Sequence, residues 1–181
     1  MKAEALRTVL VDGELRLEPL TEVHREPLRA ACAADPDIWD IYPISFLGDA
    51  FDRNMTAILA DPARTMLAIL HNGELVGMSG YLNIAPAHRR LEIGSSYIAP
   101  AVRGTGLNGR AKTLMIDHAV ASGFERTEFK VDARNARSLA AVAKLGAVRE
   151  GVMRRDRVTW TGHVRDTVVF SILRDEWSSA R

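Results

Sequence analysis

The chain has 181 residues, 47% of them hydrophobic, and its 24 basic and 23 acidic residues leave a formal net charge of +1. This length predicts a single domain over residues 1–181, and the dispersed basic residues give no reason to expect a nucleic-acid partner. The single cysteine, Cys32, excludes an internal disulfide, and the absence of an apolar signal or membrane-length segment predicts a cytoplasmic protein without a membrane partner.

The first part of the chain predicts a strand followed by two helices. Residues 15–20 alternate between apolar and polar side chains, which is typical of a strand. A helical stretch follows from Thr21, in the cap position, through residue 34, and Pro27 is expected to kink or restart it. A second, short helix is predicted from Asp49, with four apolar residues on one face: Phe51, Met55, Ile58 and Leu59.

Between these helices lies an irregular aromatic segment, residues 35–43. Trp39 and Tyr42 either line a pocket or fill the core beneath a loop, and the two alternatives have equal weight. A pocket closed around them would favour a small-molecule substrate, whereas an open groove would favour a peptide.

The middle of the chain predicts an antiparallel meander and a long helix. Strands over 65–70 and 74–82 flank His71-Asn-Gly73, a two-residue hairpin signal, and a third strand runs over 88–98. The next helix ends near Gly123. Its apolar positions recur at helical spacing, with three charged residues on the other side: Arg110, Lys112 and Asp117.

The last part predicts a strand over 127–132, a helix that Asn135 caps and Gly146 ends, and two strands over about 148–155 and 164–173. The whole order predicts an α+β fold with a mixed sheet of about seven strands and flanking helices. It does not match alternating βαβ units.

A glycine-rich turn, Arg103-Gly-Thr-Gly-Leu-Asn108, leads into the long helix. The first turn of a helix presents unpaired N–H groups and the positive end of its dipole. Gly104 and Gly106 carry no Cβ, so an anion can approach the main chain, and Arg103 adds a positive charge. The segment therefore predicts a phosphate-binding site built mainly from main chain.

Two other phosphate-binding motifs fit less well. Residues 104–109 match the G-x-G-x-x-G pattern of dinucleotide-binding proteins. However, the preceding strand is polar, four residues intervene, and too few residues follow Asp132 for the rest of a doubly wound sheet. A nicotinamide-dependent oxidoreductase is thus a distant alternative. A Walker A loop is excluded because no Gly-Lys-Ser/Thr follows the glycines.

Three stretches in this order resemble the GCN5-related N-acetyltransferases. Residues 103–108 resemble the signature Gln/Arg-x-x-Gly-x-Gly/Ala, which grips the pyrophosphate of acetyl-coenzyme A; Asn108 stands where Gly or Ala is usual. Asn135-Ala-Arg-Ser138 followed by Lys144-Leu-Gly-Ala147 looks like the next helix in the ribosomal-protein N-terminal acetyltransferase (RimJ/RimL-like) branch. Residues 150–154 and 162–177 look like the closing strands of that branch. The resemblance spans about residues 12–177.

The resemblance implies an acetyltransferase fold and direct transfer of an acetyl group from acetyl-coenzyme A to a primary amine in a ternary complex. The amine would belong to a peptide N-terminus or a small molecule, and a homodimer through the last strands is implied as well. Implied cofactor contacts are Tyr97, Ile98, Arg103, Gly104, Thr105, Gly106, Leu107, Asn108 and Asn135. Arg154 is implied at the acceptor site, where Trp39 and Tyr42 are the other candidates. No metal is expected, since no His, Cys and Asp cluster has ligand spacing.

Two residues are candidates for proton transfer. Glu92, on the strand before the glycines, is the best guess for a base that takes the amine proton through water; alternatively it only pairs with Arg90 or Arg154. Ser138 is a candidate proton donor to the sulfur, because Val142 occupies the place where many relatives have a tyrosine acid. The simpler interpretation makes Asn135 a helix cap and Ser138 an ordinary first-turn residue.

The missing tyrosine leaves a second function open, a module that binds acyl-coenzyme A as a sensor without turnover. The sequence does not identify the acceptor amine or the acyl-chain preference, because acceptor-binding loops differ among proteins that share one fold.

Overall fold

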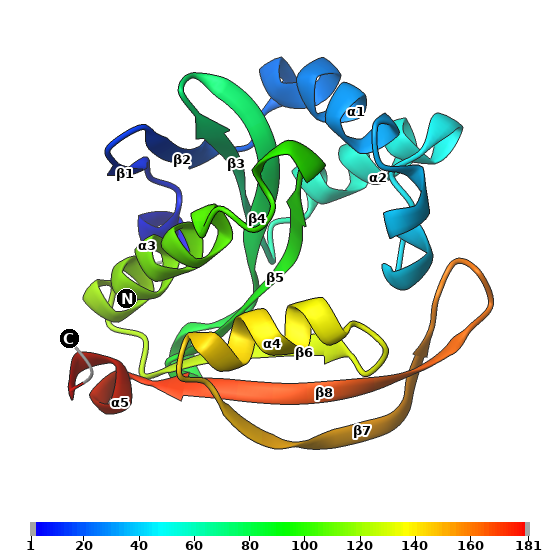
Figure 1. The fold of residues 1–181 in the computed structure, drawn as a ribbon. Helices are drawn as coiled ribbons and strands as arrows, with labels where there is room; N and C mark the ends of the chain where they lie inside the picture. The colour runs from blue at the N-terminus through cyan, green and yellow to red at the C-terminus, as the bar shows by residue number, and fades with distance from the viewer. Residues whose placement is uncertain (1–2, 180–181) are drawn as a thin grey trace.

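The computed structural model describes residues 3–179, and an eight-stranded sheet runs through it. In spatial order the strands are β1 (Leu10–Asp12), β2 (Leu15–Pro19), β3 (Thr65–His71), β4 (Glu74–Ala85), β5 (Arg90–Ile98), β6 (Arg126–Asp132), β8 (Val164–Leu173) and β7 (Val148–Val158). Among the strands of the described residues, only β5 and β6 pair in parallel (Figure 1). The predicted mixed sheet and its antiparallel meander are confirmed. The additional strand is the short β1.

Helices flank the sheet. The α-helices are α1 (Arg25–Ala33), α2 (Gly48–Ala60), α3 (Leu107–Ala121), α4 (Ala136–Lys144) and α5 (Arg174–Ser179). Short 3₁₀ turns are η1 (Ala3–Leu6), η2 (Glu22–His24), η3 (Pro36–Ile41), η4 (Pro86–His88) and η5 (Pro100–Val102). Within residues 3–179, none of these helices has the length and apolarity needed to cross a membrane.

Several helix and strand ends differ from the predicted ones. The helical stretch predicted from Thr21 is divided into η2 and α1, and α1 restarts at Arg25 with Pro27 in its first turn, where its missing N–H would have no helical partner. Asp49 lies inside the first turn of α2 rather than at its cap, which is Leu47. β4 continues to Ala85, and the turn η4 delays the start of β5.

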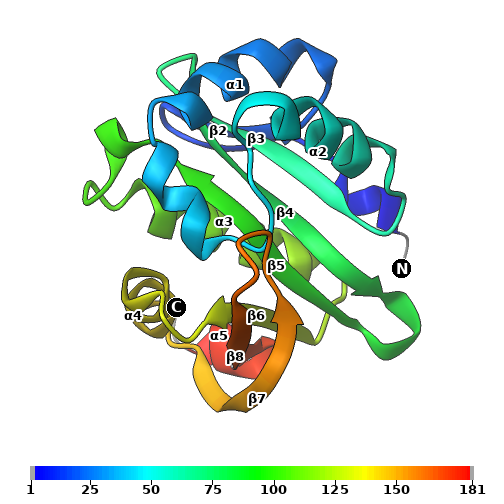
Figure 2. The same cartoon turned by 90° about the vertical axis from the view of Figure 1, so that its right-hand side faces the viewer.

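The strands of the meander are buried on both faces. In β3, Leu67 and Ile69 pack into the core under α3, whereas Met66 and Ala68 pack into a second core under α1 and α2. Successive side chains of a strand point to opposite faces, so a run of apolar residues needs a cover on each. Figures 1 and 2 show α3 on one side of this half and α1 and α2 on the other.

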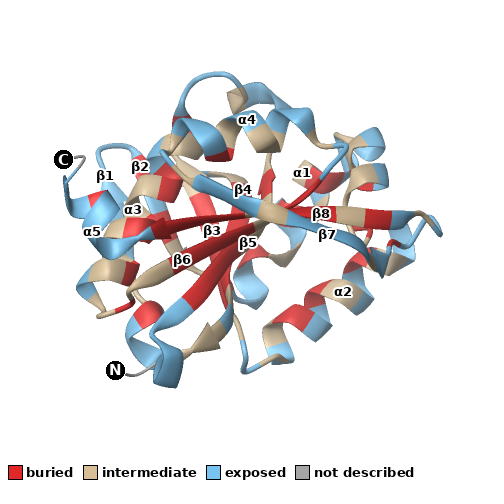
Figure 3. Cartoon of the chain, turned by 90° about the horizontal axis from the view of Figure 1, so that it is seen from below, coloured by how far each residue is buried: buried red, intermediate tan, exposed pale blue. Residues whose placement is uncertain are grey.

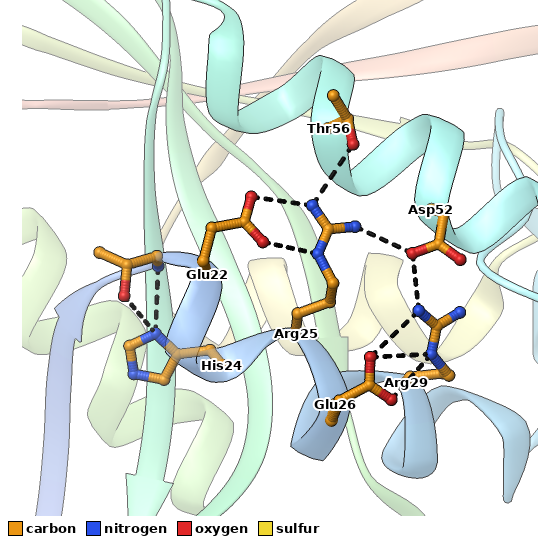
Figure 4. Close-up of polar contacts among 8 residues, drawn as sticks. Glu22, His24, Arg25, Glu26, Arg29, Asp52 and Thr56 are labelled. Atoms are coloured by element: carbon orange, nitrogen blue, oxygen red, sulfur yellow. Dashed lines mark hydrogen bonds and ion pairs between the residues drawn. The ribbon is translucent and has the colours of Figure 1, made fainter.

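A polar network fixes α1 against α2 (Figure 4). Arg25 and Arg29 of α1 both contact Asp52 of α2, at 3.0 and 2.6 Å, and Arg25 also donates to Thr56 at 3.3 Å. These partly exposed pairs add little stability individually, but the shared carboxylate joins them in one network. The network therefore ties together the two helices that the segment containing η3 connects.

β5 and β6 diverge soon after they begin (Figure 1). Within residues 3–179, their backbone pairing is confined to the three steps from Arg90↔Arg126 to Glu92↔Glu128. Beyond Glu92, β5 pairs only with β4 in this part of the chain, which leaves its other edge open.

Beyond this divergence, one face of β6 and β8 is apolar and packs into the core beneath α3 and α4. The side chains that alternate with this face are mostly polar and include Lys130, Asp132, Arg165 and Thr167. β7 lies at the sheet edge and is mostly exposed (Figure 3).

Gly77 lets β4 approach β5 closely, and its replacement by alanine tests how much the fold depends on this contact. An added Cβ would lie 2.2 Å from the main-chain oxygen of Tyr97, so the strands must separate. Gly77→Ala is expected to lower the free energy of unfolding by about 2 kcal/mol or more in urea titrations. Gly151→Ala on β7 is the control, since its Cβ meets nothing within 4 Å. Equal stability of the two variants would contradict the prediction.

Candidate functional site

A cleft of about 1060 Å³ lies where β5 and β6 diverge. Its walls come from β5, β6, the first turns of α3, the helix α4, the segment after η3, and the start of β8. Many of the predicted site residues line it: Tyr42, Glu92, Ile98, Arg103, Gly104, Gly106, Asn108, Asn135 and Ser138. The fold therefore brings together residues that are distant in the sequence.

Trp39 does not line the cleft. Its side chain has no exposed surface, stacks on Tyr97 with ring centroids 5.1 Å apart, and donates from its indole N–H to the Cys32 oxygen at 3.2 Å. Tyr97 is buried as well, and its hydroxyl donates to the main-chain oxygen of Ala31 at 2.6 Å. Trp39 and Tyr97 therefore both belong to the core. Tyr42 alone of the aromatic pair reaches the cleft.

Arg154 also lies elsewhere, on the exposed face of β7. The register of β7 against β8 passes from Met153↔Thr167 to Arg157↔Arg165, so β7 carries extra residues there. Such a bulge breaks the alternation of side chains, which the sequence does not reveal. Arg157 and Arg165 line the cleft in place of Arg154.

The glycine-rich segment has the geometry of an open main-chain cradle. Gly104 and Gly106 adopt φ values of 79° and 86°, in the left-handed region that favours glycine. A Cβ built on either of them, or on Gly109, would meet nothing within 4 Å. At the start of α3, the Arg110 N–H donates to the Gly106 oxygen at 3.1 Å. The N–H groups of the residues before Arg110 lie ahead of this helical hydrogen bond and point out of the start of the helix. An anion can approach these groups.

Two predicted residues of this segment turn their side chains away from the cradle. Leu107 is buried in the core under α3. The Thr105 hydroxyl donates to the Val102 oxygen at 2.8 Å and lies within 3.4 Å of the Leu107 N–H. Their contribution to an anion site is therefore limited to main chain.

Arg103 is not a free charge at the mouth of the cleft. Its guanidinium forms an ion pair with Asp35, and its Nε donates to the main-chain oxygen of Ile98 at 2.8 Å. Asp35 lies before η3, and no sequence pattern marks it as a partner of Arg103. Arg103 instead fixes the end of β5 against the helical layer.

The open edge of β5 presents main-chain groups to the cleft. The Ala99 N–H donates to Val76 of β4 at 2.8 Å, so the alternating positions 96 and 98 face away from β4. Their carbonyls accept hydrogen bonds from the Tyr42 hydroxyl at 2.5 Å and from Arg103 at 2.8 Å. The N–H groups of Ser96 and Ile98 face the same edge. Burial raises the pKa of Tyr42 to about 12, which keeps its hydroxyl a donor.

Lys112 is buried, although the helical pattern places it on the polar side of α3. Its Nζ donates to the Ser79 hydroxyl at 2.7 Å and to the Ser96 hydroxyl. The two hydroxyls are 2.9 Å apart, beside a bulge at which Ser95 has a φ of 49°. Burial lowers the pKa of Lys112 to about 7. Lys112 thus lines the cleft with a lowered pKa and two hydroxyl groups as its hydrogen-bond partners.

Glu92 faces the cleft with two partners, neither of them an arginine. Asn83 donates to its carboxylate at 2.8 Å, and the Lys130 ammonium lies 3.1 Å away. Arg90, the expected alternative partner, contacts Glu128 instead at 3.3 Å. The Glu92 side chain is 9% exposed, so its carboxylate has a defined position.

On α4, Asn135 caps the helix by accepting a hydrogen bond from the Ser138 N–H at 3.0 Å. Ser138 and Val142 both line the cleft, so an apolar surface occupies the place of the absent tyrosine. Asn108 Oδ1, across the cleft on α3, is buried and has no hydrogen-bond partner within residues 3–179. A buried acceptor of this kind fits a ligand that brings a donor.

Arg165 of β8 is another cleft residue that sequence reasoning missed. It is 5% exposed, its Nη2 donates to the Lys130 oxygen at 3.2 Å, and burial followed by the nearby Arg157 lowers the pKa of its guanidinium. Alternation with buried Val168 places it opposite the core, but nothing in the sequence marks that face as a cleft wall. No group of His, Cys, Asp and Glu in the described part of the chain could hold a metal ion.

Comparison with known proteins gives a consistent result. Residues 14–148 match the family described as acetyltransferase (GNAT) domain. An acetyltransferase structure from T. thermophilus is 34% identical, with a TM-score of 0.87 over 95% of this chain and 92% of that chain. None of the curated proteins matches the sequence.

Two more distant structures share the fold and were solved with ligands. Mycobacterium smegmatis RimJ, in complex with CoA-disulfide, is 22% identical, with a TM-score of 0.79 over 90% of this chain and 83% of that chain. Spermidine N-acetyltransferase from Vibrio cholerae, with CoA and spermine, is 17% identical, with a TM-score of 0.76 over 92% and 99%.

Replacing Lys112 by methionine tests its buried charge through pH. The folded protein loses this proton near pH 7, whereas the unfolded chain keeps it up to about 10.5. Between these values the unfolded state binds more protons, so Lys112 makes the wild type more stable as pH rises. Between pH 7 and 10.5, the free energy of unfolding of the wild type should therefore rise by roughly 3 kcal/mol or more relative to that of Lys112→Met. Lys144→Met, at an exposed position, should show the same dependence of the unfolding free energy on pH as the wild type. The same pH dependence in Lys112→Met as in the wild type would contradict the prediction.

Proposed function

The chain belongs to the acetyltransferase (GNAT) domain family and is an acyltransferase, and we propose that it transfers the acetyl group of acetyl-coenzyme A to a primary amine. The amine would attack the thioester directly, with both substrates in the cleft. Glu92 and the β5 edge would carry the chemistry, which distinguishes this function from a module that only binds the acyl-coenzyme A.

The observation that carries the proposal is the open edge of β5, which leads into the glycine cradle. The N–H groups of Ser96 and Ile98 face this edge. They would donate hydrogen bonds to the amide groups of a pantetheine arm, as they would to a neighbouring strand. The main chain at Gly104 and Gly106 suits the pyrophosphate. Asn108 Oδ1, which lacks a partner in the described part of the chain, would accept a donor from the same ligand.

Acetyl transfer to an amine requires the amine to be neutral and the developing oxyanion to be stabilised. The Ser96 N–H is the proposed donor to the thioester carbonyl, because the Tyr42 and Lys112 contacts hold Ser96 rigidly. Glu92 is the proposed base, acting through water, because its carboxylate faces the same cleft and is positioned by Asn83 and Lys130.

The leaving thiolate needs less help. Ser138 lines the cleft near the start of α4, so it remains the proposed proton donor to sulfur, with water as the alternative. The Val142 side chain has no acidic proton that it could donate. A thiol is acidic enough for the thiolate to leave without a strong general acid.

The tip between β7 and β8 is joined to the segment around η3, which lines the proposed acceptor side of the cleft. Trp160, at the tip between β7 and β8, donates from its indole N–H to the main-chain oxygen of Trp39 at 2.7 Å, and its own main-chain N–H donates to Pro43 at 3.2 Å. This bridge favours a small-molecule amine over a long peptide. The ribosomal-protein branch stays a prediction, since the likeness to RimJ concerns the fold.

Acetyl-coenzyme A binding tests the cradle. Gly109 lines the cleft in the first turn of α3, has no positive φ, and has open space where a side chain would lie. Gly109→Trp should abolish micromolar binding, about −8 kcal/mol in calorimetry, by occupying the cradle. Gly109→Ala is the size control and should bind within a few-fold of wild type. Failure of the folded wild type to bind would contradict the proposed function.

Glu92→Gln tests the base. It keeps the size of the side chain but removes the proton-accepting charge, so kcat is expected to fall by about 10²-fold while the affinity for acetyl-coenzyme A is retained. Glu128→Gln is a matched control, because Glu128 pairs with Glu92 across β5 and β6, is equally buried at 7% exposure, and contacts Arg90 and Arg126. Equal effects of the two substitutions on kcat would assign Glu92 a structural role instead.

A further inference from the structure

The Arg165 guanidinium is buried, and no carboxylate of the described residues lies within hydrogen-bond distance of its Nε. Its Nη2 donates to a main-chain oxygen of Lys130, and its Nε is buried with no hydrogen-bond acceptor in the described residues. The nearest carboxylate oxygen, on Asp132, is 4.0 Å from Nε, beyond hydrogen-bond distance. A buried charge with an unsatisfied donor is costly, which is a reason to expect a partner from outside the chain.

The acids near Arg165 already have closer partners. Arg134 binds Asp132 through Nη2 at 2.9 Å, Nε at 3.1 Å and its main-chain N–H at 2.9 Å. Asp156 accepts from Arg157 at 2.9 Å and from Thr167 at 2.8 Å. Neither carboxylate is therefore available to neutralise Arg165 fully.

Arg165 lies on the acceptor side of the cleft together with Glu92. Both residues line the cleft, and each lies on the sheet face opposite the core under α3 and α4. The positively charged Arg165 and the negatively charged Glu92 also interact electrostatically. A molecule with an amine and a carboxylate would match this pair of charges, with its amine toward Glu92 and its carboxylate toward Arg165.

We propose that Arg165 is a specificity-determining residue that binds a carboxylate of the acceptor, so that the enzyme prefers amines that carry a nearby carboxylate. The guanidinium presents a planar set of donors that suits the two oxygens of a carboxylate. This inference rests on the proposed function. The carboxylate belongs either to a free amino acid or to an acidic side chain near a peptide N-terminus.

The experiment compares matched acceptors in an assay of coenzyme A release. One pair is L-methionine and L-methioninamide; the other is a Ser-Asp-Ala-Ala peptide amide and its Ser-Asn-Ala-Ala counterpart. Arg165→Met should lower kcat/KM about tenfold or more for the carboxylate member of at least one pair, while its neutral counterpart changes less than about twofold. Comparing variant with wild type for each acceptor cancels the basicity of the amine itself.

Arg165→Lys should give a smaller loss, since lysine keeps the charge but not the planar donors. Arg89→Met is the matched control for loss of one positive charge, because the Arg89 side chain is 64% exposed and contacts Glu125. It should leave both pairs unchanged. Thermal melting and calorimetry with acetyl-coenzyme A verify that each variant is folded and still binds its first substrate.

A binding measurement makes the result independent of turnover. Wild type should bind N-acetyl-L-methionine or the N-acetylated Asp peptide more tightly than the amide or Asn counterpart, and Arg165→Met should lose this difference. Equal loss for both members of each pair, or an unchanged preference in Arg165→Met, would overturn the proposal. Failure to bind acetyl-coenzyme A would instead overturn the proposed function, and the carboxylate binding measurement would still decide the role of Arg165.

Discussion

The divergence of β5 from β6 is the constraint on which the site depends. Parallel pairing stops after Glu92↔Glu128, so the rest of β5 keeps one unpaired edge inside the protein. Unpaired main-chain groups are costly when buried, and Tyr42 and Arg103 satisfy the carbonyls of Ser96 and Ile98 on this edge. The remaining N–H groups face a cleft that a strand-like ligand would fill. The glycine cradle at the end of β5 extends the same main-chain surface to an anion.

A second feature is the concentration of buried charge around this cleft. Lys112 on one side of the sheet contacts only hydroxyl groups among the described residues, and Arg165 on the other contacts a main-chain oxygen. Glu92 combines an ion pair with Lys130 and a hydrogen bond from Asn83. Such groups reduce the stability of the empty protein, and they become favourable when a ligand supplies the opposite charge or a donor. The arrangement is therefore more readily explained by binding and catalysis than by stability.

The alternation of strands and the period of helices predicted the burial of side chains correctly where both faces of an element are ordinary core or solvent. They failed where an element borders the cleft. The long helix was predicted correctly, but Lys112 lies against Ser79 and Ser96 instead of solvent because these hydroxyls provide partners on the buried face. Arg154 was expected at the acceptor site, but next to a bulge in β7 it lies outside the cleft, which Arg157 and Arg165 line instead. Trp39 proved to be core because η3 turns its ring onto Tyr97. The local sequence does not specify the register between strands that are distant along the chain. Nor does it specify which residue will lie opposite a given side chain in the folded protein.

The sequence by itself determined the α+β order, the antiparallel meander and the glycine-rich entry to α3, because turns, caps and periodicity act over a few residues. The sequence also indicated the family, by the resemblance of residues 103–108 and of the segment after Asn135. Only the tertiary structure decided that Asp35 neutralises Arg103, that Lys130 holds Glu92, and that Arg165 is buried without a carboxylate partner within hydrogen-bond distance. These contacts join or separate groups that are far apart along the chain, and packing of the whole sheet fixes them.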